Sequence, residues 1–512
     1  MSENNFESKR RQLHERIAHA ELMGGAEKLQ TRKDAGILNA RERLKYFFDG
    51  NSFKEIGKLA RSIHREQREK TPADGKLAAF GKVDGRQVAA VANDMTVLGA
   101  SSSAVNAKKI AYVKRTAIRS GFPLVFMSES SGSRIQDTMG AGQMGLVGSD
   151  PKQYRRMRET PWVSAVMGNC FGSSSWYSSL SDFVVMRKGS CFAVSSDRVT
   201  SVAINQVVDA EELGGWKLHS EVTGMVDMVV DTDEEALDVS RKFLSYLPSH
   251  SMEAPPRIDP SNLKNTFHES VCELVPEDQR QVYDMRKVIA ALVDEGSYFP
   301  LKDLFAKSVV TSLARIDGRS VGIIASNPKY KGGAMDPDAC DKAIGFLVLC
   351  DSFNIPLVML EDTPGFLIGV HGERKKASGK IMNFMHALQM CTVPKVLVII
   401  RKAYGQAYLN FGGGRNADES AAWFNAEISF MDSRVGANII LGGKDPNKEE
   451  LEEMAAMIDK ESNAFELADV FGVQHVISPE QTRSFLVDAL ELHCTKKRGV
   501  GKRLMQGWPT TY

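Results

Sequence analysis

The sequence is poor in the features that mark metal, disulfide and membrane proteins. Its seven cysteines are scattered, and none forms a C-x-x-C pair, which argues against a zinc ribbon or a disulfide framework. The ten histidines show neither HxxxH nor HExxH spacing, so no metal is expected. The apolar runs, such as 346–350 and 398–400, are far shorter than the roughly 18 residues of a membrane-spanning helix. We therefore interpret the cysteines as reduced, buried thiols.

The chain also has little excess charge of either sign. It contains 65 Lys and Arg against 64 Asp and Glu, a formal net charge of +1, so no overall field attracts nucleic acid or an anionic membrane. The first residues, MSENNFESKRRQLHER, contain no apolar core of a secretory signal, and we expect a cytoplasmic protein. With 512 residues, 43% of them hydrophobic, the chain is long enough for two to four domains.

The chain repeats itself at a nearly constant spacing. The segment GKVDGRQVAAVAND, 81–94, resembles ARIDGRSVGIIASN, 314–327, which lies 233 positions further on. The same spacing separates Pro123 from Pro356, Pro161 from Pro394, and Gly172 from Gly405. Because chance similarity rarely keeps one register over about 90 residues, a gene duplication is the economical account. It predicts two domains of about 250 residues each.

The boundary between these domains is indicated by composition. Residues 252–262, MEAPPRIDPSN, are rich in proline and polar residues and lack periodicity, as in a linker. We therefore expect one domain over 1–255 and a second over 256–512. The first 35 residues are expected to form a charged helical arm.

Each half alternates short β-branched runs with helical stretches. The runs VAAVAN, PLVFMSES, WVSAVMGN and FVVMRK are continuous rather than alternating, which predicts strands of a covered, largely parallel sheet. Helices are predicted over 101–120 and 336–353; in the second, Ala343, Phe346 and Cys350 fall on one face. The fold class is therefore α/β.

Glycine-bearing turns follow strands at related places in the two halves. One pair is SESSGSR, 128–134, and EDTPGF, 361–366; the other is GNCFGSSSWY, 168–177, and RKAYGQAY, 401–408. In the second pair a helix is expected after the glycine, so that backbone N–H groups point outward. Such a nest can hold a phosphate, or a carbonyl oxygen that becomes an oxyanion; a plain left-handed turn is the structural alternative.

Other motifs give weaker indications. The sequence has no G-x-x-x-x-G-K-[ST], and GAGQMG, 140–145, follows a helix-like segment rather than a strand, so it is not expected to bind a dinucleotide. A Ser-His-Asp triad would need His219, His371 or His475 and lacks the G-x-S-x-G elbow. His219 is interpreted as a packed or capping histidine. Glu361 and Asp362 are adjacent and point apart on an extended segment, which excludes an acid–base pair.

Two further features leave alternatives open. The basic stretch KKRGVGKR, 496–503, is either a solvated terminus or an aid in binding a phosphorylated ligand. The tryptophans Trp162, Trp176 and Trp423 lie beside the glycine turns and either belong to the core or line a ligand slot.

Several segments together resemble one enzyme family. ARERLKYFFDGNSF, SSGSRIQD, ELGGWKLH, DTPGF, RKAYG and the FNIPLV run are similar to the carboxyltransferase subunit of biotin-dependent acyl-CoA carboxylases. That family includes propionyl-, methylcrotonyl- and acetyl-CoA carboxylases, transcarboxylase and related biotin-dependent decarboxylases. The resemblance covers about residues 35–500. It implies a tandem pair of crotonase-like ββα-superhelix domains, in agreement with the duplication.

The resemblance also implies roles for particular residues. The domain over 1–255 would bind the acyl-CoA, and that over 256–512 the carboxybiotin, with the site between two subunits of a hexamer. Oxyanion holes would lie at Gly172 and Ser173 for the thioester oxygen, and at Gly405 and Gln406 for the ureido oxygen of biotin. The carboxyl group would move between biotin and the α-carbon, or the vinylogous γ-carbon, of the acyl group. Gly132, Arg134, Gly214 and Gly215 would lie beside the CoA, and Gly365, Phe366 and Tyr404 on the biotin side.

The sequence departs from the family pattern at both oxyanion loops. The family usually has Gly-Gly there, whereas this chain has Gly-Ser and Gly-Gln. A backbone donor survives this substitution only where the second residue keeps a negative φ. The polar, bulky stretch after Gly172 and the charged run VHGERKK after TPGFLIG bear on substrate choice.

The chain lacks an ATP-grasp glycine loop and a Met-Lys-Met biotinylation motif. We therefore expect biotin to arrive on a separate carrier protein, with a biotin carboxylase as a further partner and no nucleic acid. Two alternatives remain: an acyl-CoA decarboxylase of the same fold, and a non-catalytic paralogue that binds acyl-CoA. The sequence leaves the acyl chain, the direction of transfer and the oligomer size open.

Overall fold

The chain divides into two compact units. A computed structural model describes residues 2–50, 52–145, 150–259, 271–442, 446–494, 501 and 503–509. The units are Met1–Ser245 and Tyr246–Tyr512. The predicted boundary lay at 255, after the start of the proposed linker. Residues 252–259 hold no helix or strand, and the Ile258 N–H donates to the Gly318 carbonyl at 2.9 Å, so this part of the linker is attached to the second unit.

The first unit is built on an eight-stranded sheet. Its order is β1-β2-β3-β4-β5-β6-β8, and β7 pairs with the end of β5. The strands are β1 (Lys54–Ile56), β2 (Lys76–Val83), β3 (Arg86–Asn93), β4 (Leu124–Ser130), β5 (Trp162–Phe171), β6 (Phe183–Arg187), β7 (Phe192–Ala193) and β8 (Met228–Val230). β1, β2 and β3 are antiparallel, and every pairing from β3 onward is parallel. The predicted α/β class is confirmed.

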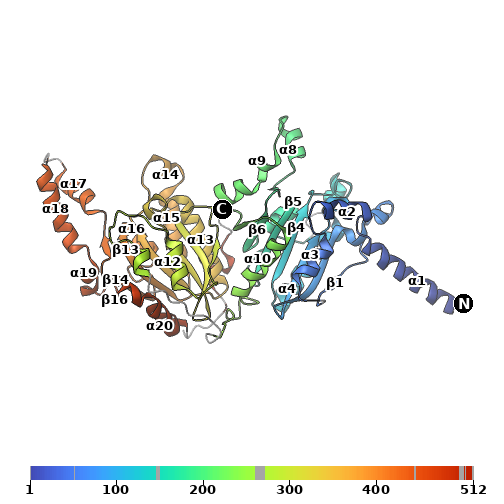
Figure 1. The fold of residues 1–512 in the computed structure, drawn as a ribbon. Helices are drawn as coiled ribbons and strands as arrows, with labels where there is room; N and C mark the ends of the chain where they lie inside the picture. Colours follow the sequence, from blue (N-terminus) through green and yellow to red (C-terminus); the bar gives the residue numbers. More distant parts are fainter. Residues whose placement is uncertain are drawn as a thin grey trace. The chain divides into compact units, whose positions relative to one another are not determined.

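The helices of this unit pack around the sheet or extend from it (Figure 1). They are α1 (Ser2–Glu21), α2 (Ala26–Asp34), α3 (Ala40–Phe47), α4 (Ala104–Ser120), α5 (Ile135–Thr138), α6 (Ala141–Met144), α7 (Ser173–Ser179), α8 (Asp197–Ile204), α9 (Ala210–Gly214) and α10 (Asp233–Tyr246). α4 begins at a Ser103 capping box and ends at Gly121, which has φ +73°. Its buried face lies on β2 and β3, so the helix predicted over 101–120 is present.

The second unit repeats this architecture. Its sheet has the order β9-β10-β11-β12-β13-β14-β16, with β15 beside the end of β13. The strands are β9 (Phe299–Leu301), β10 (Val309–Ile316), β11 (Arg319–Ser326), β12 (Leu357–Thr363), β13 (Lys395–Tyr404), β14 (Glu419–Trp423), β15 (Glu427–Ser429) and β16 (His475–Ile477). The helices are α11 (Val271–Leu274), α12 (Met285–Leu292), α13 (Pro337–Ser352), α14 (Val370–Arg374), α15 (Ala377–Met390), α16 (Gly405–Asn410), α17 (Ser433–Leu441), α18 (Lys448–Glu461), α19 (Ala464–Asp469) and α20 (Thr482–Cys494).

The two sheets match residue for residue at the spacing read from the sequence. Ala89 pairs with Leu124 in the first sheet, and Gly322 pairs with Leu357 in the second, so both partners shift by 233 positions. The hairpin turns also correspond: Asp84 and Asp317 both have φ +50°, as the Asp-Gly turn of a twisted hairpin requires. An irregularity recurs where β4 meets β5, between Ser128 and Ser130, and where β12 meets β13, between Glu361 and Thr363.

A buried lysine is duplicated as well. Lys109 Nζ donates to the Ala73 carbonyl at 2.8 Å, and Lys342 Nζ donates to the Phe305 carbonyl at 2.8 Å. Both lysines also bond the first carbonyl of the neighbouring strand, which ties a helix to the strand entry. Burial lowers the pKa of Lys109 to about 8.

The described cysteines are all free thiols. Five of them are buried, as expected from the sequence, but Cys272 is exposed and Cys494 is half-buried. Within the described ranges, none of the helices combines the length and the apolar character needed to cross a membrane.

Candidate active site

The first glycine turn lies where β5 passes into α7. Gly172 has φ +61° and ψ −129°, a conformation that is open essentially only to glycine. A Cβ built on it would lie 3.4 Å from the Cα of Gly132, so the two glycine loops touch here. Ser173 begins α7 and has no left-handed φ. The second position of this turn therefore accepts a side chain without backbone strain, as the Gly-Ser sequence requires.

Only part of this turn offers an open donor. The Gly172 N–H already donates to the Val194 carbonyl at 3.2 Å. The Ser173 N–H has no acceptor among the residues that the structure describes. Gly172 thus supplies the backbone conformation, and Ser173 supplies the available N–H.

A second open donor comes from the loop after β4. The Gly132 carbonyl accepts from the Ser102 N–H at 2.8 Å, and the Arg134 N–H donates to the Ser102 carbonyl at 2.9 Å. These two bonds hold Ser133 between them, and its own N–H has no acceptor in the described part of the chain. A Cβ on Gly172 would lie 3.9 Å from the Ser133 nitrogen. Ser133 is not among the site residues predicted from the sequence.

The second turn, between β13 and α16, has the same construction. Gly405 has φ +61°, and a Cβ on it would lie 3.0 Å from the Phe430 carbonyl oxygen. Gln406 lies inside α16 and has no left-handed φ. Its side chain turns along the helix, where Nε2 donates to Asn410 Oδ1 at 3.0 Å.

The loop after β12 again holds one residue between two backbone bonds. The Met335 N–H donates to the Gly365 carbonyl at 3.1 Å, and the Leu367 N–H donates to the Met335 carbonyl at 2.8 Å. The residue between is Phe366, which is 233 positions after Ser133. Over the described ranges, neither Phe366 nor Gln406 has an acceptor for its N–H. Ser133 could therefore have been predicted from the sequence, because it lies one duplication spacing before Phe366, which was predicted.

The remaining predicted residues lie near these turns but differ in exposure. Arg134 is 3% exposed, and its guanidinium is held by Asp74 Oδ1 at 2.7 Å, so it is engaged inside the protein. Gly214 and Gly215 end α9, and a Cβ on Gly214 would lie 2.4 Å from the Phe192 carbonyl oxygen. This close approach holds α9 against β7.

On the second turn, Tyr404 is buried and its hydroxyl donates to Glu427 Oε2 at 2.7 Å. Burial and this carboxylate together raise the pKa of Tyr404, so its phenol stays protonated. Gly365 has φ +112°, and a Cβ there would lie 3.7 Å from the Tyr404 carbonyl. The predicted residues Gly365, Phe366, Tyr404, Gly405 and Gln406 thus belong to one pair of touching loops.

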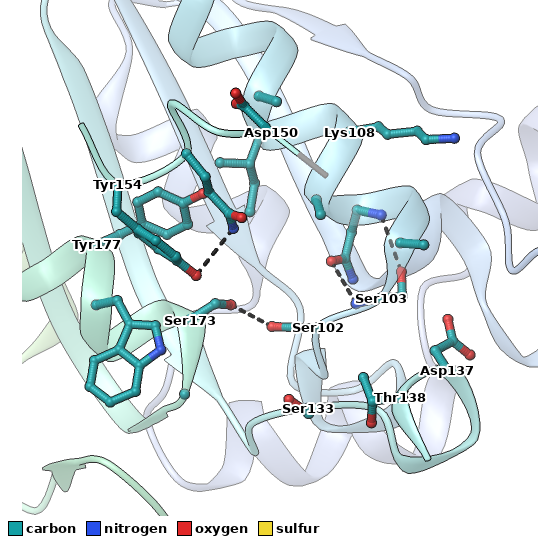
Figure 2. A pocket seen from close by; sticks show the side chains of 18 of the residues that line it. Ser102, Ser103, Lys108, Ser133, Asp137, Thr138, Asp150, Tyr154, Ser173 and Tyr177 are labelled. Carbon is teal, nitrogen blue, oxygen red and sulfur yellow. Dashed lines mark hydrogen bonds between the residues drawn. The ribbon is translucent and has the colours of Figure 1, made fainter. Parts of the chain in front are cut away.

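A cavity of about 900 Å³ opens beside the first turn. Figure 2 shows Ser102 and Ser173 facing one another across its floor, with Tyr154 and Tyr177 on one side and Ser133, Asp137 and Thr138 on the other. Trp176 also lines the cavity, whereas Trp162 and Trp423 are buried in the two cores. Of the two alternatives that the sequence left open, the cavity lining holds for Trp176 and the core position holds for Trp162 and Trp423.

Among the candidate acid–base groups, His219 and Asp362 are engaged in structural hydrogen bonds, and Glu361 is buried. His219 is buried, with Nε2 2.6 Å from the Phe192 carbonyl oxygen, which confirms the packed histidine. Asp362 accepts from Arg401 Nε and from the Tyr283 hydroxyl, both at 2.8 Å. Glu361 is fully buried, and burial raises its pKa well above the usual range. The two adjacent carboxyl groups therefore do not act as a pair.

The basic stretch 496–503 lies outside the described residues except for 501 and 503. Arg503 Nε donates to Asn354 Oδ1 at 2.8 Å, which ties the end of the chain to the second unit.

Comparison with known proteins identifies the family. Residues 31–506 match the carboxyl transferase domain family. Methylmalonyl-CoA decarboxylase subunit alpha of Veillonella parvula is 34% identical over 495 residues, covering 95% of this chain and 96% of that one. The carboxyltransferase subunit of Haloferax mediterranei propionyl-CoA carboxylase is 34% identical over 503 residues, with the same two coverages. The crystal structure of transcarboxylase 12S superposes with a TM-score of 0.89 at 33% identity, covering 96% of both chains.

The chain therefore belongs to the carboxyl transferase domain family and has its crotonase-like fold. Within that family it is an enzyme of the biotin-dependent acyl-CoA carboxyltransferase type, as the sequence resemblance predicted.

Proposed function

We propose that the two glycine turns are a pair of oxyanion holes for carboxyl transfer between carboxybiotin and an acyl-CoA. The observation that carries this proposal is the repeated geometry of Gly172 and Gly405, each at φ +61° where a strand passes into a helix whose first turn holds an open N–H. The unit over 1–245 takes the acyl-CoA, because its turn opens into the large cavity. The unit over 246–512 takes the carboxybiotin.

The chemistry requires two such holes. Carboxybiotin releases its carboxyl group as CO₂, and the biotin nitrogen left behind takes the α-proton of the acyl-CoA thioester. The enolate that forms then bonds to the CO₂. The open N–H groups of Ser133 and Ser173 stabilise the thioester oxygen as it gains negative charge. Those of Phe366 and Gln406 stabilise the ureido oxygen. Each well-aligned donor lowers the barrier by roughly 3 kcal/mol, because it is already oriented before charge develops.

The other predicted residues act by holding these donors in place. Arg134, paired with Asp74, fixes the loop that presents Ser133. Gly214 lets α9 approach β7, next to the Val194 carbonyl that fixes the Gly172 turn, and Gly215 leaves room for Glu211 at the end of α9. Gly365 and Tyr404 hold the donors of the second turn in place, because their two loops touch there. None of these roles needs a side-chain base, which agrees with the engaged states of His219 and Asp362.

We further propose that the chain works as a hexamer with a separate biotin carrier and a biotin carboxylase. The transcarboxylase 12S structure, to which this chain is similar over its length, is described as a hexamer and as a multienzyme core with methylmalonyl-CoA bound. Decarboxylation of an acyl-CoA is the second candidate, because a methylmalonyl-CoA decarboxylase subunit is similar to the same degree. A non-catalytic paralogue is disfavoured, because Ser173 and Gln406 fit their turns without left-handed strain.

The proposal is tested with the purified chain and a panel of carboxylated acyl-CoAs, with and without free biotin. Mass spectrometry follows the loss of CO₂ from each CoA thioester. We expect biotin-dependent decarboxylation of at least one panel member. Loss of CO₂ that is equal without biotin would favour a decarboxylase acting alone. Binding without any turnover would contradict the catalytic assignment of the turns.

A further inference from the structure

The strands that lead into the oxyanion turns are broken at the same place in both units. β4 advances two residues, from Ser128 to Ser130, over a stretch in which β5 advances four. β12 and β13 show the same break, 233 positions later. A bulge of this kind leaves residues unpaired and disrupts the ladder of hydrogen bonds. Both donor loops begin just beyond the break, so the separation of the two donors depends on what joins the strands there.

A buried carboxylate lies at the break in both units. Glu129 is the middle residue of the break in β4, and Asp362, 233 positions later, is the middle residue of the break in β12. They are 5% and 0% exposed. Burial alone would raise the pKa of Glu129, but Arg43 and Arg32 lower it below its usual range. Glu129 is therefore ionised at neutral pH.

In the first unit the cations come from the helices α2 and α3. Arg32 holds Glu129 with two bonds, from Nη1 to Oε1 at 3.0 Å and from Nη2 to Oε2 at 2.9 Å. Arg43 Nη1 donates to Glu129 Oε2 at 2.6 Å, and Arg43 Nη2 donates to the Met167 carbonyl at 3.4 Å. That carbonyl lies in the break of β5 and also accepts from Arg187 Nη2 at 2.9 Å. Arg43 thus joins β4 to β5 where the ladder is missing.

In the second unit the carboxylate is held by the neighbouring strand itself. Arg401, in β13, donates from Nε to Asp362 Oδ2 at 2.8 Å, and the Lys402 N–H donates to Asp362 Oδ1 at 3.2 Å. The residue 233 positions before Arg401 is Gly168. A Cβ on Gly168 would lie 2.4 Å from Glu129 Oε1, so the first unit has no room for a side chain there.

The helices show the reverse exchange. α3 begins after the side-chain cap Asn39, and α12 begins after the side-chain cap Asp284. The fourth residue of α3 is Arg43, whereas the fourth residue of α12 is Val288, and both are buried. The cation has therefore changed place between the units, while the carboxylate and the break are the same. Since a buried ion pair rarely adds stability over apolar residues of similar volume, its presence in both units points to the geometry that it sets.

We propose that these two carboxylates and their arginines are positioning residues, which hold the two donor N–H groups of each oxyanion hole at their working separation. This inference rests on the proposed function, because it takes the N–H groups of Ser133 and Ser173 as the donors. It gives α2 and α3 a part in the reaction, although neither helix lines the cavity. A misplacement of about 1 Å in such a site can lower a rate by about 10²-fold.

The test replaces Arg32 with methionine, which leaves Arg43 to neutralise Glu129. Glu129→Gln is the second variant and removes the charge itself. We expect kcat for biotin-dependent decarboxylation to fall about ten- to hundredfold in both, with KM within about twofold, because the donors act mainly as charge develops. The kcat is referred to the number of CoA-binding sites, counted by isothermal titration calorimetry, so that unfolded chain does not appear as slow enzyme.

Arg41→Met is the matched control. Arg41 lies on α3 beside Arg43, but its ion-pair partner is Glu55 on β1, at 2.6 Å. Loss of this pair should lower stability and keep kcat within about twofold. A wild-type kcat per binding site in Arg32→Met and Glu129→Gln would overturn the inference. An equal loss in Arg41→Met would overturn it too, because any lost ion pair would then have the same effect.

Hydrogen exchange separates this inference from the proposed function. The N–H groups of Ser102, Arg134 and Gly172 make the bonds that fix the two donor loops. In Arg32→Met they should exchange at least about fivefold faster than in the wild type, and in Arg41→Met at the wild-type rate. If the wild type shows no biotin-dependent turnover, the proposed function fails. The exchange rates then decide alone, and an unchanged rate in Arg32→Met would overturn the positioning role.

Discussion

Replacing Gly405 with alanine tests the second oxyanion turn most directly. A non-glycine residue at φ +61° costs roughly 1–2 kcal/mol. The new Cβ would also lie 3.0 Å from the Phe430 carbonyl oxygen, so that the turn or β15 must shift by a few tenths of an ångström. We expect a total loss of about 1–3 kcal/mol in the free energy of unfolding. For a unit of this size that lowers the Tm by roughly 3–10 °C.

The effect on activity should be much larger than the effect on stability. A shift of the turn moves the Gln406 N–H away from the ureido oxygen, and loss of one oxyanion donor lowers kcat about 10²–10³-fold. The assay is biotin-dependent decarboxylation of a carboxylated acyl-CoA, with CoA binding measured separately. Binding to the first unit should stay within twofold of wild type, because the substitution lies in the other unit.

Gly296→Ala is the control for backbone strain. Gly296 has φ +70° and open space around its missing Cβ, so this variant has the backbone cost without the collision. It should lose stability but keep the transfer rate within about threefold. If Gly405→Ala retained more than a third of the wild-type rate, the turn would not be a donor site, and the mechanism would fail for the second unit.

Three further predictions follow from the same geometry. Gln406→Ala should keep the transfer rate within about threefold, because the donor is the backbone N–H and only the bond to Asn410 is lost; a drop of thirtyfold would contradict this. Lys109→Met should weaken a pH dependence: the folded pKa of about 8 lies below the unfolded value, so Lys109 makes the stability of the wild type rise between pH 8 and about 10.4. Urea unfolding at pH 8 and 10 should show a smaller rise in the variant, where Lys76, whose pKa is also lowered to about 8, still contributes. Arg401→Leu should cost about 3–5 kcal/mol in chemical denaturation, because it leaves buried Asp362 without its cation; a cost below about 1 kcal/mol would refute the pairing.

The strands and the duplication could be predicted because their signals are local. Runs such as PLVFMSES define buried parallel strands, and the two Asp-Gly hairpins fall in the same register of both halves. The glycine turns could be predicted as well, because Gly172 and Gly405 are separated by the same 233 positions as the strands. The structure adds that both glycines have the same left-handed φ, which a sequence alone does not fix.

The identity of the donors could not be predicted, because it depends on distant partners. Whether the Gly172 N–H is available is decided by the Val194 carbonyl, which belongs to the segment after β7. Arg134 is motif-like in sequence, yet it is buried because Asp74, 60 positions earlier, pairs with it.

The shared irregularity at the ends of β4 and β12 gives the loops after these two strands the same backbone course. Each loop leaves its strand at the same register, closes onto a neighbour through one bridge and meets a glycine of the same φ. A segment such as 128–134 could therefore be transplanted into the place of 361–367 without adding or removing a residue. The chain thus carries two versions of one module, and an engineer could recombine them to exchange what each unit recognises.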